Sequence, residues 1–209
     1  MKNPFENISK KNVEKLLKLL DADTIEFIKD SVISKTIIDN NSIGIITDGY
    51  IQILRNSYEG NETVIEELEK NDIIGSSITY IESNEYTMIA KEKTNIIVLD
   101  ENRLMNFNDT TKNYYNQFIK NIFSILNDKL KIKNERIQII TKKTIRDKLL
   151  EYFYINRKKT GSVNIYLPYN YTAFADYLCV NRSALMREIK HLKEEGFIET
   201  KGHRIKLLY

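Results

Sequence analysis

The sequence has 209 residues, of which 42% are hydrophobic and 29% are charged, and its net charge is +3. This length suffices for one large domain or for two modest domains that each bury a hydrophobic core. The N-terminal segment lacks the apolar core of a signal peptide, and no uncharged apolar run is long enough to span a bilayer. We therefore expect a soluble cytoplasmic protein without membrane contacts.

Charge is divided unevenly along the chain. Residues 141–209 carry 14 Lys and Arg against 7 Asp and Glu, whereas residues 1–140 carry 18 against 22. A basic C-terminal third favours a nucleic-acid-binding module, although scattered lysines also serve solubility. The single cysteine, Cys179, excludes an intramolecular disulfide, a zinc ribbon and a conventional cysteine-held iron–sulfur centre, and we expect it to be a small buried thiol.

The first half of the chain changes from a helical to a β pattern. Val13, Leu16 and Leu20 have helical spacing, which predicts a short opening helix. From about residue 34 to residue 99, short runs such as YIQIL and TNIIVL alternate with turn signals such as Asp48-Gly49. This pattern predicts an antiparallel β unit, in the form of a small sandwich, roll or barrel.

Residues 101–140 contain no Gly or Pro and carry an apolar stripe, which predicts a long helix. Two interpretations of the stripe remain open: a parallel dimer interface, which its width favours, or packing of the helix on its own β domain. The residues predicted to form the dimer interface are Tyr115, Phe118, Ile119, Ile122, Ile125 and Leu126.

The basic third predicts a helix that ends at Gly161, a short strand, two helices joined by the turn CVN, and a terminal hairpin. Apolar residues of the two helices, from Phe174 to Leu192, lie on faces that meet across the turn. The second helix then turns a polar face outward, and its arginines suit base recognition in the major groove. This face comprises Arg182, Ser183, Met186, Arg187 and Lys190.

The stretch FADYLCVNRSALMREIKHLKEEGFI resembles the winged helix–turn–helix of the Crp/Fnr family of bacterial transcription regulators. More weakly, the segment from IGIITDG to NDIIGS resembles that family's cyclic-nucleotide-binding-type β-roll. The resemblance implies an α+β fold with an N-terminal antiparallel β-roll sensor at 1–109, a long dimerisation helix at 110–140 and a DNA-binding winged helix–turn–helix at 141–209.

The resemblance also implies function. We expect a homodimeric, sequence-specific regulator on a palindromic double-stranded operator, with RNA polymerase as a further candidate partner. The Ser183 position departs from the family pattern, which often has glutamate there, so the operator is not implied. Residues expected to contact DNA are Tyr171, Thr172, Asn181, Arg182, Ser183, Met186, Arg187, Lys190, Lys201 and Arg204.

The effector is the least defined part of the resemblance. Ser76 follows Gly75 where cyclic-nucleotide-binding members have a glutamate, and Glu85 lies near the position of their phosphate-binding arginine. Both histidines lie in the DNA-binding part, away from the positions of haem ligands. We therefore expect no haem, iron–sulfur or cyclic-nucleotide cofactor and leave an unknown small-molecule effector open. The candidate effector pocket comprises Ile74, Gly75, Ser76, Ser77, Glu85 and Tyr86.

Two other functional classes are alternatives to a transcription regulator. One is an effector-binding module whose winged helix contacts protein or RNA, which the salt dependence of duplex binding would distinguish. The other is an enzyme, which we do not expect because the sequence shows no nucleophile–base pair, metal-ligand cluster or phosphate-binding G-x-x-x-x-G-K-[ST] loop.

Overall fold

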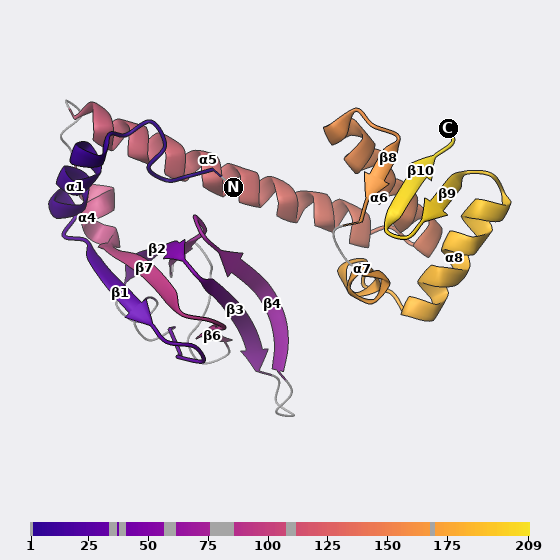
Figure 1. The fold of residues 1–209 in the computed structure, drawn as a ribbon, viewed down its shortest axis with the longest axis horizontal. Helices are drawn as coiled ribbons and strands as arrows, with labels where there is room; N and C mark the ends of the chain where they lie inside the picture. The colour runs from indigo at the N-terminus through magenta and orange to yellow at the C-terminus, as the bar shows by residue number, and fades with distance from the viewer. Residues whose placement is uncertain are drawn as a thin grey trace. The chain divides into compact units, whose positions relative to one another are not determined.

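The computed structural model describes residues 2–33, 37, 41–56, 62–75, 86–107, 112–167 and 170–209. The chain divides into two compact units, Met1–Asp128 and Lys129–Tyr209 (Figure 1). Helices and antiparallel sheets occur in both units, which confirms the predicted mixed class of helices and antiparallel strands. Within the described residues, no helix has both the length and the apolar character needed to cross a membrane.

Unit 1 opens with helix α1, Lys10–Leu19, which buries Leu16. Strand β1, Asp23–Phe27, follows directly and pairs antiparallel with β7, Thr94–Asp100. The sequence pattern had placed the first strands only after residue 33, so β1 was missed. Its two apolar residues are flanked by acidic ones, and its burial is only partial. A strand this short and polar gives little periodic signal.

Two antiparallel sheets make up the β part of unit 1. The first has the order β1-β7-β2-β5, in which β2 is Ser42–Asp48 and β5 is Ile73–Gly75. The second has the order β4-β3-β6, with β3 at Tyr50–Asn56, β4 at Glu62–Glu69 and β6 at Tyr86–Ala90. Between β2 and β3 the chain turns at Gly49, whose φ is +98°. A Cβ there would lie 2.4 Å from Thr94 Oγ1, so the turn requires glycine.

The central strands of the first sheet, β2 and β7, are buried on both faces, which explains their nearly continuous Ile and Val. One face packs against the second sheet, where Ile46 and Ile96 meet Ile51 and Met88. The opposite face is covered by α1, by α4, Glu101–Asn106, and by the first half of α5. This second layer includes Leu16, Ile43, Ile45, Ile97, Leu99, Leu104, Phe118, Ile122 and Ile125.

Helix α5, Asn113–Ile140, is a single helix of 28 residues. Residues 2–8, here called the N-terminal strap, run along its first half. Lys2 Nζ lies 2.9 Å from the carboxylate of Asp128, and the ring of Phe5 stacks on Phe118 with 5.5 Å between centroids. Asn121 Nδ2 donates to two main-chain carbonyls of the strap at 2.9 and 2.8 Å. The strap therefore joins the start of unit 1 to its end.

Unit 2 is built around α6, Ile145–Thr160. The helix begins at Thr144, whose Oγ1 accepts a hydrogen bond from Asp147 N at 3.0 Å, and ends at Gly161 in the left-handed conformation, as predicted. The remaining elements are β8 at Asn164–Tyr166, α7 at Tyr171–Tyr177, α8 at Arg182–Glu194, β9 at Ile198–Lys201 and β10 at Arg204–Leu207.

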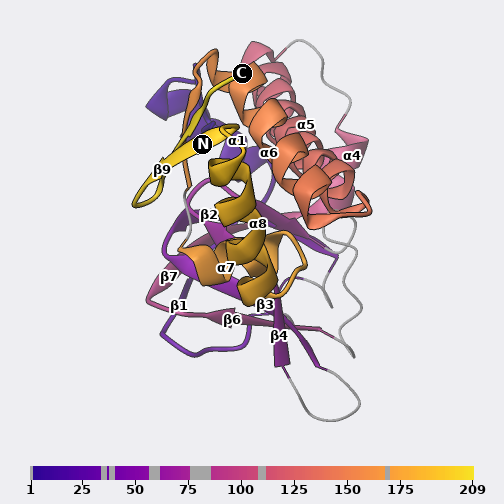
Figure 2. The ribbon, with the colours of Figure 1, turned by 90° about the vertical axis from the view of Figure 1, so that its right-hand side faces the viewer.

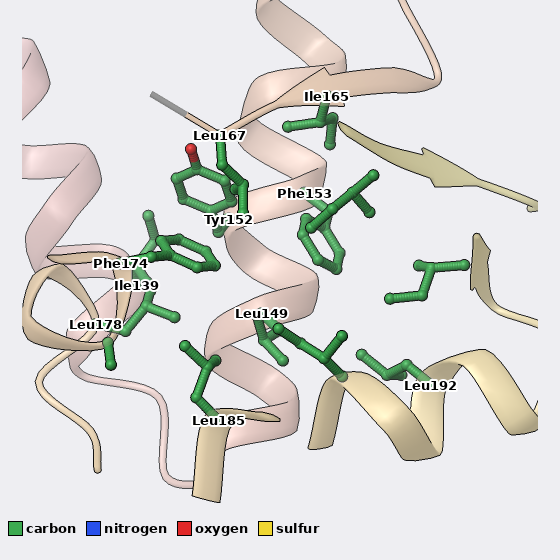
Figure 3. Packing of buried hydrophobic residues seen from close by; sticks show 14 of the residues in the cluster. Ile139, Leu149, Tyr152, Phe153, Ile165, Leu167, Phe174, Leu178, Leu185 and Leu192 are labelled. Carbon is green, nitrogen blue, oxygen red and sulfur yellow. The ribbon is translucent and has the colours of Figure 1, made fainter. Parts of the chain in front are cut away.

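One hydrophobic core holds these elements together. Tyr152 and Phe153 of α6 lie at its centre, between Phe174 of α7 and Ile165 of β8 (Figure 3). Leu185 and Leu192 reach the same core from α8, and both are completely buried. The three short strands form a sheet in the order β8-β10-β9 beside the helices. The core thus fixes the inner face of α8 and leaves its outer face to solvent.

Candidate nucleic-acid interface

Helices α7 and α8 are joined by a tight turn whose geometry the sequence sets locally. Asn170 Oδ1 accepts from Ala173 N at 2.9 Å at the start of α7, and Asn181 Oδ1 accepts from Ser183 N at 2.8 Å at the start of α8. Both asparagines are therefore N-caps. Asn181 was predicted to contact DNA, and the structure gives its side-chain oxygen this capping role at the start of α8.

Cys179 lies in the same turn, with a φ of +52°. Its thiol is exposed, so the expectation of a buried thiol is wrong. The left-handed conformation turns the side chain away from the core, and Leu178 fills the buried position instead. Lys148 Nζ of α6 donates to the Leu178 carbonyl at 3.0 Å, placing a cation at the C-terminal end of α7.

The outer face of α8 is an exposed surface that carries basic side chains. Arg182, Ser183, Arg187 and Lys190 are exposed, and 38% of Met186 is accessible. Lys190 Nζ lies 3.6 Å from Glu194 in an exposed pair, which adds little stability. Arg182 and Arg187 form no ion pair with any residue in the described ranges. Figure 2 shows α8 side-on beside α6 and α7.

A polar clamp holds the C-terminal end of α8 on α6. The Arg146 guanidinium donates to both carboxylate oxygens of Glu195 and lies 3.5 Å from Glu188. It also stacks over the Phe197 ring, with 5.1 Å from Cζ to the centroid. The hydrogen bonds from Arg146 lower the pKa of Glu195 below its usual value, and the same bonds raise the pKa of Arg146. The clamp was not found from the sequence, because its partners are 49 residues apart.

The terminal hairpin, β9 and β10, places the remaining predicted contacts in different surroundings. Lys201 is exposed at the end of β9. Arg204 points to β8 instead, where Nε and Nη2 donate to Asn164 Oδ1 at 3.0 and 2.7 Å. At the start of α7, Thr172 is exposed, whereas Tyr171 is half-buried and its Oη donates to Gly202 O at 3.0 Å. Burial raises the pKa of Tyr171.

The predicted dimer residues of α5 lie mostly inside unit 1. Phe118 is completely buried, and Tyr115, Ile122 and Ile125 are 7–8% exposed in the core against the first sheet; Ile119 and Leu126 are half-buried at its edge. Exposed apolar side chains occur elsewhere on the helix, at Phe123, Leu130 and Ile137, with 67%, 57% and 52% accessible. Their separation of seven residues is the signal that could have identified them.

The predicted effector pocket can be placed only in part. Ile74 and Gly75 are buried in β5, with the Ile74 side chain in the core between the sheets. Tyr86 is half-buried at the start of β6, and the Arg55 guanidinium lies over its ring at 6.0 Å. Ser76, Ser77 and Glu85 lie outside the described residues. Arg55 was not singled out from the sequence, yet its guanidinium lies beside Tyr86 of the predicted set.

Comparison with known proteins identifies the fold. No protein-family model matches the sequence, and no curated protein matches it significantly. Among solved structures, the chain is similar to CprK complexed with OCPA, with a TM-score of 0.65 and 19% identity over 94% of this chain and 92% of that one. CooA from Carboxydothermus hydrogenoformans aligns with a TM-score of 0.57 and 19% identity over 95% of this chain and 92% of that one. The c-di-GMP responsive global regulator CLP of Xanthomonas campestris aligns with a TM-score of 0.52 and 13% identity over 95% of this chain and 99% of that one.

These similarities span almost the whole chain, so the predicted resemblance to Crp/Fnr regulators is confirmed at the level of the fold. They also correct one expectation. We expected no cofactor, because the residues that hold haem, an iron–sulfur cluster or a cyclic nucleotide are missing. CprK was solved with bound OCPA, and CLP is responsive to c-di-GMP, so this expectation is wrong. The absence of residues that hold haem, an iron–sulfur cluster or a cyclic nucleotide does not exclude a ligand that is held by other contacts.

Proposed function

We propose that this chain is a sequence-specific, DNA-binding transcription regulator of the Crp/Fnr type that acts as a homodimer on a palindromic operator. The outer face of α8 is the observation that carries the proposal. Its arginines extend from a helix whose inner face is fixed by Leu185, Ile189 and Leu192. An α-helix fits the major groove, and a guanidinium can donate to guanine O6 and N7 together. The fold shared with regulators supports this function over an enzymatic one.

Within this proposal, residues 141–209 are a winged helix–turn–helix, in which α8 reads bases and the hairpin β9–β10 is the wing. Arg182, Met186 and Arg187 face base edges, with Ser183 beside them. Thr172, Lys190 and Lys201 are exposed and are assigned to phosphates. Phosphate contacts add affinity without sequence preference, whereas base contacts provide specificity.

Dimerisation is assigned to residues 110–140, through a revised set of side chains. Phe123, Leu130 and Ile137 alternate with Ile119, Leu126, Lys133 and Ile140 at intervals of four and three residues. This is the spacing of a two-stranded coiled coil. We call this stripe the α5 seam. Tyr115, Phe118, Ile122 and Ile125 of the original prediction serve the core of unit 1 instead.

Residues 1–109 are assigned as a β-roll sensor that responds to a small molecule. Two stacked antiparallel sheets with a buried layer between them support this assignment. A ligand regulates DNA binding only if it binds the DNA-competent state more tightly than the other.

Selection of duplexes from a random library with the purified protein tests the proposed function. We expect enrichment of one inverted repeat, and a footprint that covers both half-sites. Arg187→Ala should weaken binding to this repeat by about 1–3 kcal/mol while leaving non-specific binding almost unchanged. Lys158→Ala, which removes an exposed charge from α6, is the matched control. Failure to enrich any duplex, or stronger binding to RNA, would contradict the proposal and favour the RNA-binding alternative.

A further inference from the structure

The tip of the β9–β10 hairpin is tied to the first residue of α7. Tyr171 Oη donates to the carbonyl oxygen of Gly202 at 3.0 Å. Its ring also lies nearly parallel to the imidazole of His203, with centroids 6.1 Å apart and planes at 15°. Gly202 and His203 form the turn itself, next to the exposed Lys201. A half-buried tyrosine thus joins two elements that are 31 residues apart in the sequence.

The other side of the hairpin is fixed independently. Leu167 N donates to His203 O at 2.9 Å, and Arg204 donates to Asn164 Oδ1 through two nitrogens. The first contact holds the turn, and the second holds the start of β10, to the β8 side of the sheet. The Tyr171 hydroxyl holds the tip from the α7 side, so the turn is fixed from two directions.

Helix α7 offers a firm attachment point for this contact. Phe174, one turn beyond Tyr171, is completely buried in the unit 2 core, and Asn170 caps the helix at the Ala173 amide. A side chain on such a helix has little freedom to follow a moving hairpin. The position of Gly202 is therefore set by the core of the unit through α7.

We infer that Tyr171 is a positioning residue for DNA binding, which fixes the wing so that the Lys201 ammonium is held at a phosphate. This inference rests on the proposed function and replaces the direct DNA contact predicted for Tyr171. The hydroxyl is already used within the protein, as donor to Gly202 O. Its effect on DNA is exerted through Lys201, which is exposed on the same hairpin.

The first experiment needs no DNA. Trypsin cleaves after Lys201, and cleavage requires the hairpin tip to open. Tyr171→Phe removes only the hydroxyl and keeps the ring stacked on His203. We expect cleavage at Lys201 to become about 3-fold to 10-fold faster, because one hydrogen bond that closes the tip is lost. Tyr154→Phe, which removes a hydroxyl from an exposed tyrosine of α6, should leave the rate unchanged. Equal cleavage of Tyr171→Phe and the unmodified protein would overturn the inference.

The second experiment is a double-mutant cycle on duplex binding. Tyr171→Phe should weaken binding to all duplexes about 3-fold to 10-fold and reduce the slope of log K against log salt by about 0.9, the value for one phosphate. In a Lys201→Ala background it should have no further effect, since the contact it positions is already absent. Additive losses would mean that Tyr171 acts on DNA independently of Lys201. Absence of duplex binding by the unmodified protein would refute the proposed function, while proteolysis would still decide whether the tether exists.

Discussion

At the scale of single residues, the turn between α7 and α8 contains a local strain. Cys179 adopts a φ of +52°, which costs an L-residue other than glycine about 1–2 kcal/mol. Its thiol is exposed and contributes nothing to the core. We predict that Cys179→Gly raises the free energy of unfolding by about 0.5–1 kcal/mol, because part of the relief is offset by the greater chain entropy of glycine. Urea denaturation followed by circular dichroism measures the change.

The control for this substitution is Cys179→Ala. It removes the thiol and keeps a Cβ, so the strain remains and stability should stay close to that of the unmodified protein. Equal stabilisation by alanine and glycine would show that the thiol, and not the backbone, is unfavourable in this turn.

Tyr50, at the start of β3, provides a test at alkaline pH. Burial raises the pKa of Tyr50 to about 12, with a further contribution from the hydrogen bond and negative charge of Glu67. The folded state therefore favours the protonated phenol. Its contribution to stability is complete below the unfolded pKa of about 10 and is lost as the pH rises toward 12.

We predict that the difference in unfolding free energy between the unmodified protein and Tyr50→Phe is constant below pH 10 and declines between pH 10 and pH 12. Urea titrations at fixed pH measure this difference, and absorbance at alkaline pH follows the phenolate directly. Tyr154→Phe, at an exposed tyrosine, is the matched control. A pH-independent difference for Tyr50→Phe would contradict the raised pKa.

At the scale of elements, α5 shows how one helix can serve several surfaces. One face is buried against the first sheet, another lies under the N-terminal strap, and the α5 seam leaves Phe123, Leu130 and Ile137 exposed. We predict that Leu130→Glu converts the proposed dimer to a monomer, because two carboxylates would be desolvated within the seam. Sedimentation velocity measures the molecular mass.

Ile132→Glu is the matched control, since Ile132 is exposed on α5 to a similar extent, at 59%, but lies outside the seam spacing. It should remain a dimer. If Ile132→Glu dissociates the protein and Leu130→Glu does not, the dimer uses a different face of the helix.

The clamp between α6 and α8 should give a signature at acid pH. The hydrogen bonds from Arg146 lower the pKa of Glu195, so the folded state favours the carboxylate. This stabilisation is complete above the ordinary glutamate pKa of 4.5 and is lost as the pH falls through the lowered value. We predict that Glu195→Gln is less stable than the unmodified protein at pH 7 and equally stable at the acid end. Thermal unfolding of both proteins between pH 7 and acid pH measures this difference in stability.

The control for the clamp is Glu194→Gln. Glu194 forms only an exposed pair with Lys190 at 3.6 Å, so its replacement should change stability little at any pH. A gap for Glu195→Gln that persists unchanged at acid pH would indicate that the effect comes from packing and not from charge.

The elements of unit 2 were predictable from the sequence, whereas several roles of its side chains were not. Helical spacing and Gly161 located α6, because periodicity and caps are local signals. The surroundings of Tyr171 and Arg204 depend on Gly202 and Asn164, which are distant in sequence. On α5, the stripe correctly indicated a helix, yet the position of the first sheet decided which apolar residues it buries. The local sequence pattern predicts a helix or a strand, whereas tertiary packing decides which of its faces is buried.

At the scale of the whole molecule, a dimer on a palindrome must match the helical repeat of DNA. Two recognition helices related by a two-fold axis enter successive major grooves, with half-site centres about 34–36 Å apart. We predict that five base pairs inserted between the half-sites reduce affinity to nearly that of a single half-site, because the second half-site then faces away from the dimer by about half a helical turn. Gel-shift titration of the selected repeat with and without the insertion measures this change.

A half-site whose affinity equals that of the full repeat would contradict a dimeric mode of binding. The control is a duplex with the original spacing and a scrambled central sequence. It changes the base pairs between the half-sites without altering their phase.

The N-terminal strap has a consequence for the synthesis of the protein on the ribosome. Lys2 bonds to Ser124 across 122 residues, and the Phe118, Ile122 and Ile125 side chains form the last layer over the first sheet. Folding of a nascent domain cannot be completed before its last packing element leaves the ribosome. Until the segment around Asp128 has emerged, only α1 and α4 can cover the Ile43, Ile45, Ile97 and Leu99 side of the sheet, and the part that α5 packs against stays exposed. The nascent chain is therefore most vulnerable to aggregation while α5 is still inside the exit tunnel.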